Sequence, residues 1–281
     1  MRINTNISSL GAQEAAQNTN FNIKNSLEKL STGLKINKAS DDASGLAIAD
    51  KLRTQVTSIN QGISNGNSAI ALLQIADKSM AEQSKILDTV KSKLIQANTD
   101  TTSKDGREAI QKDIKKLLTQ LDNIATQTNY NGTNLLQTSR TSTASLTGLS
   151  FQIGENSADT ISTSNIKANT SGYALTSLKG LATNSLTKTI AGNQQTKVND
   201  AITKLNGYRG DIGSTQNQVE SAVRNLMTQS TNIKAAESVI RDVDYAEESA
   251  NFNKLNIISQ AGSYAISQSN ATQQNVLRLL Q

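Results

Sequence analysis

The sequence predicts a mainly α-helical fold: a long antiparallel helical hairpin or coiled-coil bundle with one small β-hairpin, and with the N- and C-terminal helices paired. Three observations lead to this fold class. Apolar residues recur at three- and four-residue steps over much of the chain. No proline occurs among the 281 residues, so long helices meet no strong breaker. Hydrophobic residues make up only 36% of the chain, which is low for a compact globule and favours an elongated body.

The first internal segment, residues 41–98, keeps its apolar residues on one heptad frame with weak positions such as Gly66 and Asp77. At 1.5 Å per residue it would form a helix on the order of 85 Å long. Asp41 and Asp42 precede the apolar run. Aspartate before a helical run is typical of an N-cap, so we interpret this pair as helix capping rather than as an acid–base pair.

Two further segments, residues 105–127 and 194–241, repeat the pattern. A sustained seven-residue repeat predicts helices that wind around one another. The alternative is three separate surface helices on a globule, which would require a large core that the sequence does not otherwise supply. After the second segment, Asn131 and Gly132 predict a turn, because both residues tolerate the left-handed backbone conformation.

Between residues 139 and 193 the composition changes to mostly serine, threonine, glycine and asparagine. Alternating apolar and polar residues at 149–153 and at 160–162, with Gly154 between them, predict a short hairpin. This is the only β element that we expect. Because long helices flank it, the segment should lie at the tip or along the side of the helical hairpin.

Both chain ends carry an amphipathic stripe with nothing nearby in sequence to bury against. An isolated amphipathic helix is only marginally stable in water, so each stripe needs a partner surface. That partner is the other chain end, further copies of the chain, or both. We favour burial between copies, because two paired helices alone leave one face of each in water. The residues predicted to mediate self-assembly are Ile3, Ile7, Leu10, Leu27, Leu30, Leu255, Ile258, Val276 and Leu280.

The composition argues against several classes of chemistry. The chain contains no cysteine and no histidine, which removes disulfides, thiol catalysis, the usual zinc sites and the usual general base at neutral pH. We therefore expect no enzyme activity, no cofactor and no metal site. The acidic residues between 242 and 248 lack the turn glycine and the last glutamate of a calcium-binding loop, so a solvated or salt-bridged helix face is the better interpretation.

Charge and hydropathy limit the partners. The net charge of +5 comes from lysine and arginine spread along the sequence, so we expect no nucleic-acid binding. The longest apolar stretch, residues 69–76, is interrupted by Gln74 and is far too short for a membrane span. The opening residues 1–6 lack the apolar core of a cleavable signal peptide. If the protein leaves the cell, we expect it to use another route.

Four stretches carry a resemblance to a known family. They are residues 27–37 (LEKLSTGLKIN), 41–49 (DDASGLAIA), 238–248 (SVIRDVDYAEE) and 275–280 (NVLRLL). The chain closely resembles bacterial flagellins, over about residues 1–137 and 195–281. The resemblance implies a structural, non-enzymatic subunit that polymerises into the extracellular flagellar filament used for motility.

The resemblance also implies a domain organisation and a set of partners. Residues 1–40 and 246–281 would pair as the coiled-coil domain at the filament core, and residues 41–245 would form a helical rod domain. The span 139–193 is too short for the large outer domains of longer flagellins, so we expect a short form without them. The implied partners are other copies in a helical homopolymer, an export chaperone, the filament cap and the hook-junction proteins. Export would proceed without a cleaved signal peptide.

One departure from familiar flagellins concerns recognition by animal hosts. Many flagellins are detected by a surface receptor through an arginine and a leucine on the first long helix and an acidic residue on the second. Thr89 and Lys93 stand where the arginine and leucine would be, and Asp113 stands in for the acid. Because a charged lysine must be desolvated where an apolar contact is needed, we expect weakened receptor recognition.

Two other functions remain open on the sequence alone. A hook–filament junction protein shares the paired-end design, and it would not form long filaments by itself. A secreted helical translocator or adhesin would bind host cells or membranes as a monomer, but the sequence offers no apolar segment suited to that role.

Overall fold

A computed structural model describes residues 5–183 and 185–279, apart from the side chains of residues 276–279. Over this part of the chain the protein is mainly α-helical, which confirms the predicted fold class, and it divides into two compact units. Unit 1 combines Met1–Val56 with Thr231–Gln281, and unit 2 is Thr57–Ser230. The elements are α1 (Ile7–Thr32), α2 (Ala43–Ala97), α3 (Lys104–Gln127), β1 (Asn129–Tyr130), β2 (Thr133–Asn134), β3 (Ser150–Gln152), β4 (Thr160–Ser162), α4 (Thr176–Lys179), α5 (Lys188–Arg241) and α6 (Tyr245–Leu279).

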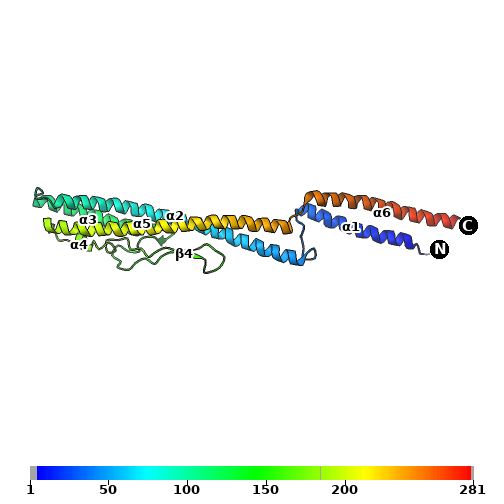
Figure 1. The fold of residues 1–281 in the computed structure, drawn as a ribbon, viewed down its shortest axis with the longest axis horizontal. Coiled ribbons are helices and arrows are strands. Elements are labelled where there is room, and N and C mark those ends of the chain that lie inside the picture. The colour runs from blue at the N-terminus through cyan, green and yellow to red at the C-terminus, as the bar shows by residue number, and fades with distance from the viewer. Residues whose placement is uncertain (1–4, 184, 280–281) are drawn as a thin grey trace. The chain divides into compact units, whose positions relative to one another are not determined.

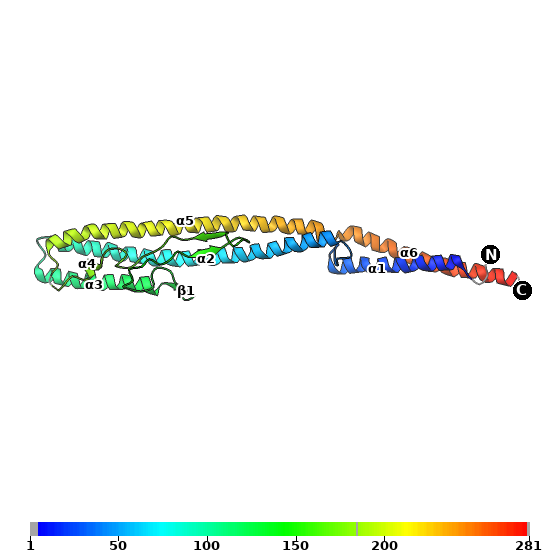
Figure 2. The same ribbon diagram turned by 90° about the horizontal axis from the view of Figure 1, so that it is seen from below.

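In unit 2, α3 and the adjoining lengths of α2 and α5 lie side by side as an antiparallel bundle (Figures 1 and 2). The amide of Gln83 in α2 donates to the carbonyl oxygen of Leu121 in α3 at 3.2 Å. The guanidinium of Arg209 in α5 pairs with Asp77 in α2 at 2.8 Å. Asp77, a weak position in the heptad frame, is therefore an ion-pair position that joins two helices.

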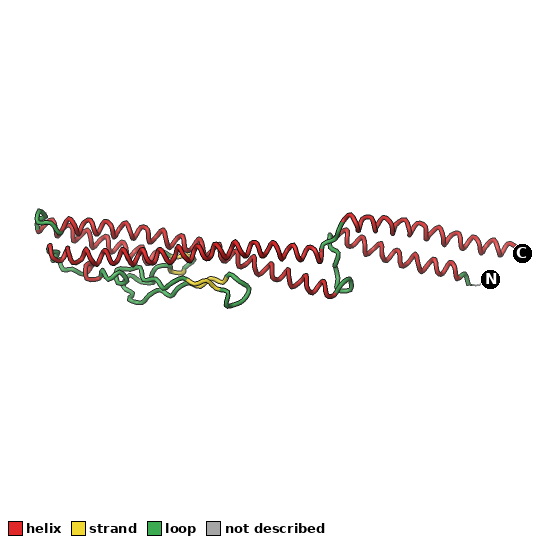
Figure 3. The backbone as a smooth tube through the Cα atoms, in the orientation of Figure 1, coloured by secondary structure: helices red, strands yellow, loops and turns green. Residues whose placement is uncertain are grey.

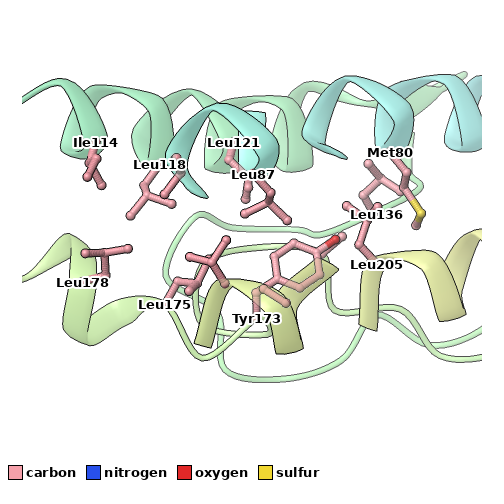
Figure 4. Packing of buried hydrophobic residues seen from close by; sticks show 14 of the residues in the cluster. Met80, Leu87, Ile114, Leu118, Leu121, Leu136, Tyr173, Leu175, Leu178 and Leu205 are labelled. Carbon is pink, nitrogen blue, oxygen red and sulfur yellow. The ribbon is translucent and has the colours of Figure 1, made fainter. Parts of the chain in front are cut away.

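The heptad positions of the three internal segments form the core of unit 2 (Figure 4). Leu87 of α2, Leu118 of α3 and Leu205 of α5 are fully buried. Burying a leucine side chain contributes about 1.5–3 kcal/mol relative to leaving it exposed. Tyr173 and Leu175, from the irregular segment before α4, face Leu87 across the core, so the packing extends beyond the helices.

The segment between residues 139 and 193 lies along the side of the bundle (Figure 3). β3 and β4 form the predicted antiparallel hairpin, with Phe151 opposite Ile161. Although the segment consists mostly of serine, threonine, glycine and asparagine, several of its apolar side chains are part of the core of unit 2. They are Ile166, Ala168, Tyr173, Leu175, Leu178 and Leu186.

A second hairpin corrects the expectation of a single β element. β1 and β2 pair through Tyr130 and Thr133 around the Asn131–Gly132 turn. Both turn residues have positive φ, 48° and 80°, which suits asparagine and glycine. The sequence revealed the turn, but strands of two residues are too short for alternation to be visible.

The loop between α1 and α2, in unit 1, uses both aspartates structurally. The carboxylate of Asp42 accepts from the backbone N–H of Gly45 at 2.9 Å, as an N-cap does. The carboxylate of Asp41 accepts from the N–H groups of Asn37 and Lys38, both at 3.1 Å, and so orders the preceding loop. Capping therefore belongs to Asp42, while Asp41 stabilises the turn before it.

Gly62 of α2 allows a close approach of the β3–β4 hairpin, so a larger residue at this position should destabilise unit 2. A β-carbon at Gly62 would lie 1.9 Å from the backbone oxygen of Ile153, which cannot move without shifting the hairpin. Gly62→Ala should therefore lower the free energy of unfolding by about 1–3 kcal/mol, as overpacked sites do. Chemical denaturation followed by far-UV circular dichroism measures the change.

The matched control is Gly207→Ala in α5. Nothing lies within 4 Å of a β-carbon at Gly207, so alanine there only improves helix propensity. We expect a gain of about 0.5–1 kcal/mol. If both variants shift stability in the same direction, the contact between Gly62 and the hairpin is not the cause.

Candidate functional site: the paired terminal helices

In unit 1, α1 and α6 run antiparallel and side by side (Figures 1 and 2). The side chain of Asn6 caps α1 by accepting from the N–H of Ser9 at 3.1 Å. Its amide also donates to the carbonyl oxygen of Ser269 in α6 at 3.3 Å. Further along the pair, Ser259 donates to Asn20 at 3.3 Å. The two chain ends therefore contact each other over most of the length of α1.

The seam between these helices consists mainly of small and polar residues. Half-buried positions recur at three- and four-residue steps on both helices, which is the spacing of a two-stranded coiled coil. On α1 they include Ser9, Ala12, Ala16, Thr19, Ile23 and Leu30, and on α6 they include Phe252, Leu255, Ser259, Gly262, Ile266 and Ser269. The large apolar residues among them are only half-buried, so the pairing of α1 with α6 leaves part of their apolar surface exposed.

Other large apolar residues of both helices are exposed rather than part of this seam. Phe21 is 65% exposed on α1, and Tyr264 is 73% exposed on α6. Scattered exposed apolar residues are ordinary, but a face that gathers them marks an interaction surface. We call this set the outer apolar residues. They are Ile7, Leu10, Phe21, Leu27, Ile257, Ile258 and Tyr264.

The residues predicted to mediate self-assembly are divided between the two faces. Leu30 and Leu255 are half-buried in or beside the seam. Four others, Ile7, Leu10, Leu27 and Ile258, are exposed outer apolar residues. Ile3 and Leu280 lie outside the described residues, as does the side chain of Val276.

The sequence reasoning missed the residues that form most of the seam. A search for large apolar side chains does not register Ala12, Ala16 or Gly262, because each contributes little hydrophobicity. The signal that could have found them is the recurrence of small residues at three- and four-residue steps, which lets two helix backbones approach closely.

A short backbone crossing joins the end of α1 to the start of α6. The N–H of Lys35 donates to the carbonyl oxygen of Arg241 at 2.6 Å, and the N–H of Val243 donates to that of Gly33 at 3.0 Å. Gly33 caps α1 with a left-handed φ of 73°. A β-carbon there would lie 2.9 Å from the hydroxyl oxygen of Tyr245, so glycine suits both the backbone and the contact.

The acidic residues around the start of α6 have structural partners. Asp244 caps α6 by accepting from the N–H groups of Ala246 and Glu247 at 2.9 and 3.2 Å. Asp242 accepts from the hydroxyl of Ser238 at 2.6 Å. Over the described part of the chain, no group of three or more acidic side chains is placed to hold a metal ion. Within residues 5–183 and 185–279, no helix has an apolar run of the length and hydropathy that a membrane crossing requires.

The three predicted receptor-contact residues lie in unit 2. Lys93 of α2 pairs with Asp113 of α3 at 2.9 Å. The hydrogen bond and charge of Lys93 hold the pKa of the Asp113 carboxyl below its usual value. The Thr89 hydroxyl, one turn away on α2, donates to the carbonyl oxygen of Lys85 at 2.9 Å. The structure thus brings together two of the three residues that the sequence singled out.

Fold and site together define a class: α-helical structural proteins in which the two ends of the chain pair and present apolar side chains outward. Comparison with known proteins identifies the family. Residues 3–141 match the family described as "Bacterial flagellin N-terminal helical region", and residues 195–280 match the family described as "Bacterial flagellin C-terminal helical region". The chain belongs to the bacterial flagellin family.

Individual relatives agree with this assignment. The flagellin of Bacillus subtilis (strain 168) is 38% identical over 303 aligned residues, covering all of both chains. The flagellar filament 33 kDa core protein of Treponema phagedenis is 33% identical over 294 residues, again covering both chains fully. A putative flagellar hook-associated protein from Vibrio parahaemolyticus has a similar fold, with a TM-score of 0.59 and 12% identity over 72% of this chain and 99% of that one. The protein is a structural subunit of the extracellular flagellar filament.

Proposed function

We propose that this flagellin polymerises through the outer apolar residues of α1 and α6. The observation that supports this is their exposure: Leu27 is 53% exposed and Ile257 is 67% exposed, while the seam holds mostly small and polar residues. Because these large side chains stay exposed when α1 and α6 pair within one chain, the helices gain further burial from neighbouring copies. Assembly is therefore an ordering step in which each incoming subunit packs its terminal helices against subunits already in the filament.

The test replaces single outer apolar residues by aspartate. Leu10→Asp, Leu27→Asp and Ile258→Asp should each reduce the yield of seeded filaments about tenfold or more, since a residue at the centre of an interface carries about 2 kcal/mol or more. Sedimentation and electron microscopy measure the yield. The far-UV circular dichroism of the soluble chain should stay unchanged.

The matched control is Gln17→Asp, which adds the same charge at an exposed polar position of α1. It should leave the filament yield close to that of the parent chain. If all four variants polymerise normally, the outer apolar residues do not form the interface. If Gln17→Asp fails as severely as the others, the loss reflects charge alone.

The finer functional assignments are also proposals. We infer a non-enzymatic role and export without a cleaved signal peptide. We infer that an export chaperone, the filament cap and hook-junction proteins bind the chain. We also infer a coiled-coil domain of residues 1–40 with 246–281 and a rod domain of residues 41–245. The ends of α1 at Thr32 and of α5 at Arg241 support these bounds, whereas the compact units divide at residues 56 and 231.

We also propose that this flagellin is a poor activator of the animal surface receptor. The support is the ion pair between Lys93 and Asp113, which places a charge where an apolar contact is needed and engages the acid. Thr89→Arg combined with Lys93→Leu should raise potency in a receptor reporter-cell assay about tenfold or more, as restoring a hot spot would. Lys85→Leu, on the same helix, is the control and should change nothing. High potency of the parent chain would contradict the proposal.

A further inference from the structure

One hydrogen bond in the seam of the terminal helices differs from the others. Ser26 is 3% exposed and is the buried residue of α1, and its hydroxyl donates to a carboxylate oxygen of Glu248 in α6. A hydrogen bond to a charged acceptor is about twice as strong as a neutral one. Among the described residues, the other side-chain bonds across the seam join neutral groups, as between Ser259 and Asn20 at 3.3 Å and between Ser269 and Asn6 at 3.4 Å.

We propose that the Ser26–Glu248 hydrogen bond sets the register of α6 against α1. This inference rests on the proposed function and deepens it, because it names the positioning residues of the assembly site. In coiled coils, a single buried polar position specifies register at some cost in stability. Ser26 is such a buried polar position here, and Glu248 is its partner on the other helix.

The remainder of the seam holds register poorly. Its small residues have similar sizes, so a shift by one heptad would place Ser269 where Gly262 now lies, opposite Ala16, without a large clash. The same shift would place Leu255 opposite Ser26 and leave Ser26 without its partner. A buried hydroxyl with no hydrogen-bond partner costs free energy, so the shift is disfavoured most at this position, beyond the loss of the bonds that Asn6 and Asn20 make across the seam.

The backbone crossing between Lys35 and Arg241 does not replace this function. It holds Arg241 and Val243 beside the end of α1, but residues 242–244 are not helical, so the crossing holds the chain before α6 rather than α6 itself. Ser26 and Glu248 form the first side-chain bond after the crossing. They therefore fix the position of α6 along α1, and with it the level at which residues such as Ile257 and Tyr264 lie in the helix pair.

Disulfide trapping measures register directly, because the chain contains no cysteine of its own. A β-carbon on Gly262 would lie 3.9 Å from that of Ala16, within the range of a disulfide. The in-register pair is Ala16→Cys with Gly262→Cys. The out-of-register pair is Ala16→Cys with Ser269→Cys, one heptad away. The full-length chain is oxidised both as soluble protein and as pelleted filaments, and the two cross-linked fractions are compared.

In the parent background we expect the in-register pair to dominate. Combining Ser26→Leu with Glu248→Leu should lower the ratio of in-register to out-of-register cross-linking about tenfold, equivalent to about 1.4 kcal/mol. If the Ser26–Glu248 bond only held the two helices together, this ratio should not fall, because two leucines add apolar contact and keep the helices paired. Glu248→Gln retains a hydrogen-bond acceptor and should keep the ratio within about twofold of the parent value. The control Asn20→Ala, at an exposed position, should not change it.

An unchanged ratio in the leucine pair, with cross-linking otherwise normal, overturns the register inference. A ratio that falls equally in Glu248→Gln and in Asn20→Ala overturns it as well. Failure of the proposed function is a separate result: the parent chain forms no filaments, while the ratio is still measured in the soluble protein. Irregular filaments from the leucine pair, together with a fallen ratio, support the inference.

Discussion

Asp122→Ala should lower the free energy of unfolding of unit 2 by about 3–5 kcal/mol, the range for removing one partner of a buried ion pair. The Asp122 side chain is fully buried on α3. It accepts from the N–H and the hydroxyl of Thr170 at 2.8 and 2.9 Å, and from the ammonium of Lys179 at 2.5 Å. One carboxylate therefore attaches the irregular segment before α4 to the bundle. Its removal leaves a cation and two donors without their acceptor.

Chemical denaturation measures the stability change, and limited trypsin digestion locates it. Lys167 and Lys179 lie on the segment that Asp122 holds, so cleavage there should increase first. Combining Asp122→Ala with Lys179→Met should cost less than the single substitution, because the half-buried ammonium of Lys179 is then no longer left without its carboxylate. Asp113→Ala removes an exposed ion pair instead and should leave unfolding unchanged. Equal losses in Asp122→Ala and Asp113→Ala would contradict the argument.

The long helices could be predicted because their signal is local and repeated. Without proline, a heptad frame sustained over residues 41–98 has few structural alternatives, and α2 follows it closely. The β3–β4 hairpin was visible for a similar reason, since alternation around Gly154 is a short-range pattern. Patterns of this kind depend on neighbours in sequence, which is the information that a single sequence carries.

The polar contacts within unit 2 could not be predicted in this way. Buried Gln83 donates to the carbonyl oxygen of Ala168 at 2.9 Å and accepts from the hydroxyl of Tyr173 at 3.1 Å. Burial also raises the pKa of the Tyr173 hydroxyl above its ordinary value. A glutamine on a helix and a tyrosine ninety positions later share no local pattern. Only the folded chain shows that a serine- and threonine-rich segment completes the core.

The terminal helices were predicted correctly as helices, and their seam was not anticipated. Large apolar residues were expected to need burial, but residues such as Leu27 and Ile258 are exposed when α1 and α6 pair within one chain. The seam is instead formed by residues such as Ala16 and Gly262. Hydrophobicity alone shows that a stripe needs a partner, and it does not show whether that partner is the same chain or another copy.

Deleting residues 246–281 should abolish filament formation and leave unit 2 folded. The deletion removes nearly all of α6, and with it the seam that supports α1. A lone helix of 26 residues with a low apolar content is marginal in water, so α1 should lose its order in the truncated chain. Both faces needed for polymerisation are then absent, and seeding with parent filaments should not elongate them.

The core of unit 2 should survive this truncation, because its main cluster extends from Leu72 to Ile212 and the other buried apolar residues of unit 2 reach only to Leu226. The thermal midpoint of its unfolding should therefore match that of the full-length chain, although the total helical signal falls. Electron microscopy measures filaments, and circular dichroism measures the midpoint. Regular filaments from the truncated chain would contradict the assembly site. Loss of the unit 2 transition would show instead that the two units depend on each other for stability.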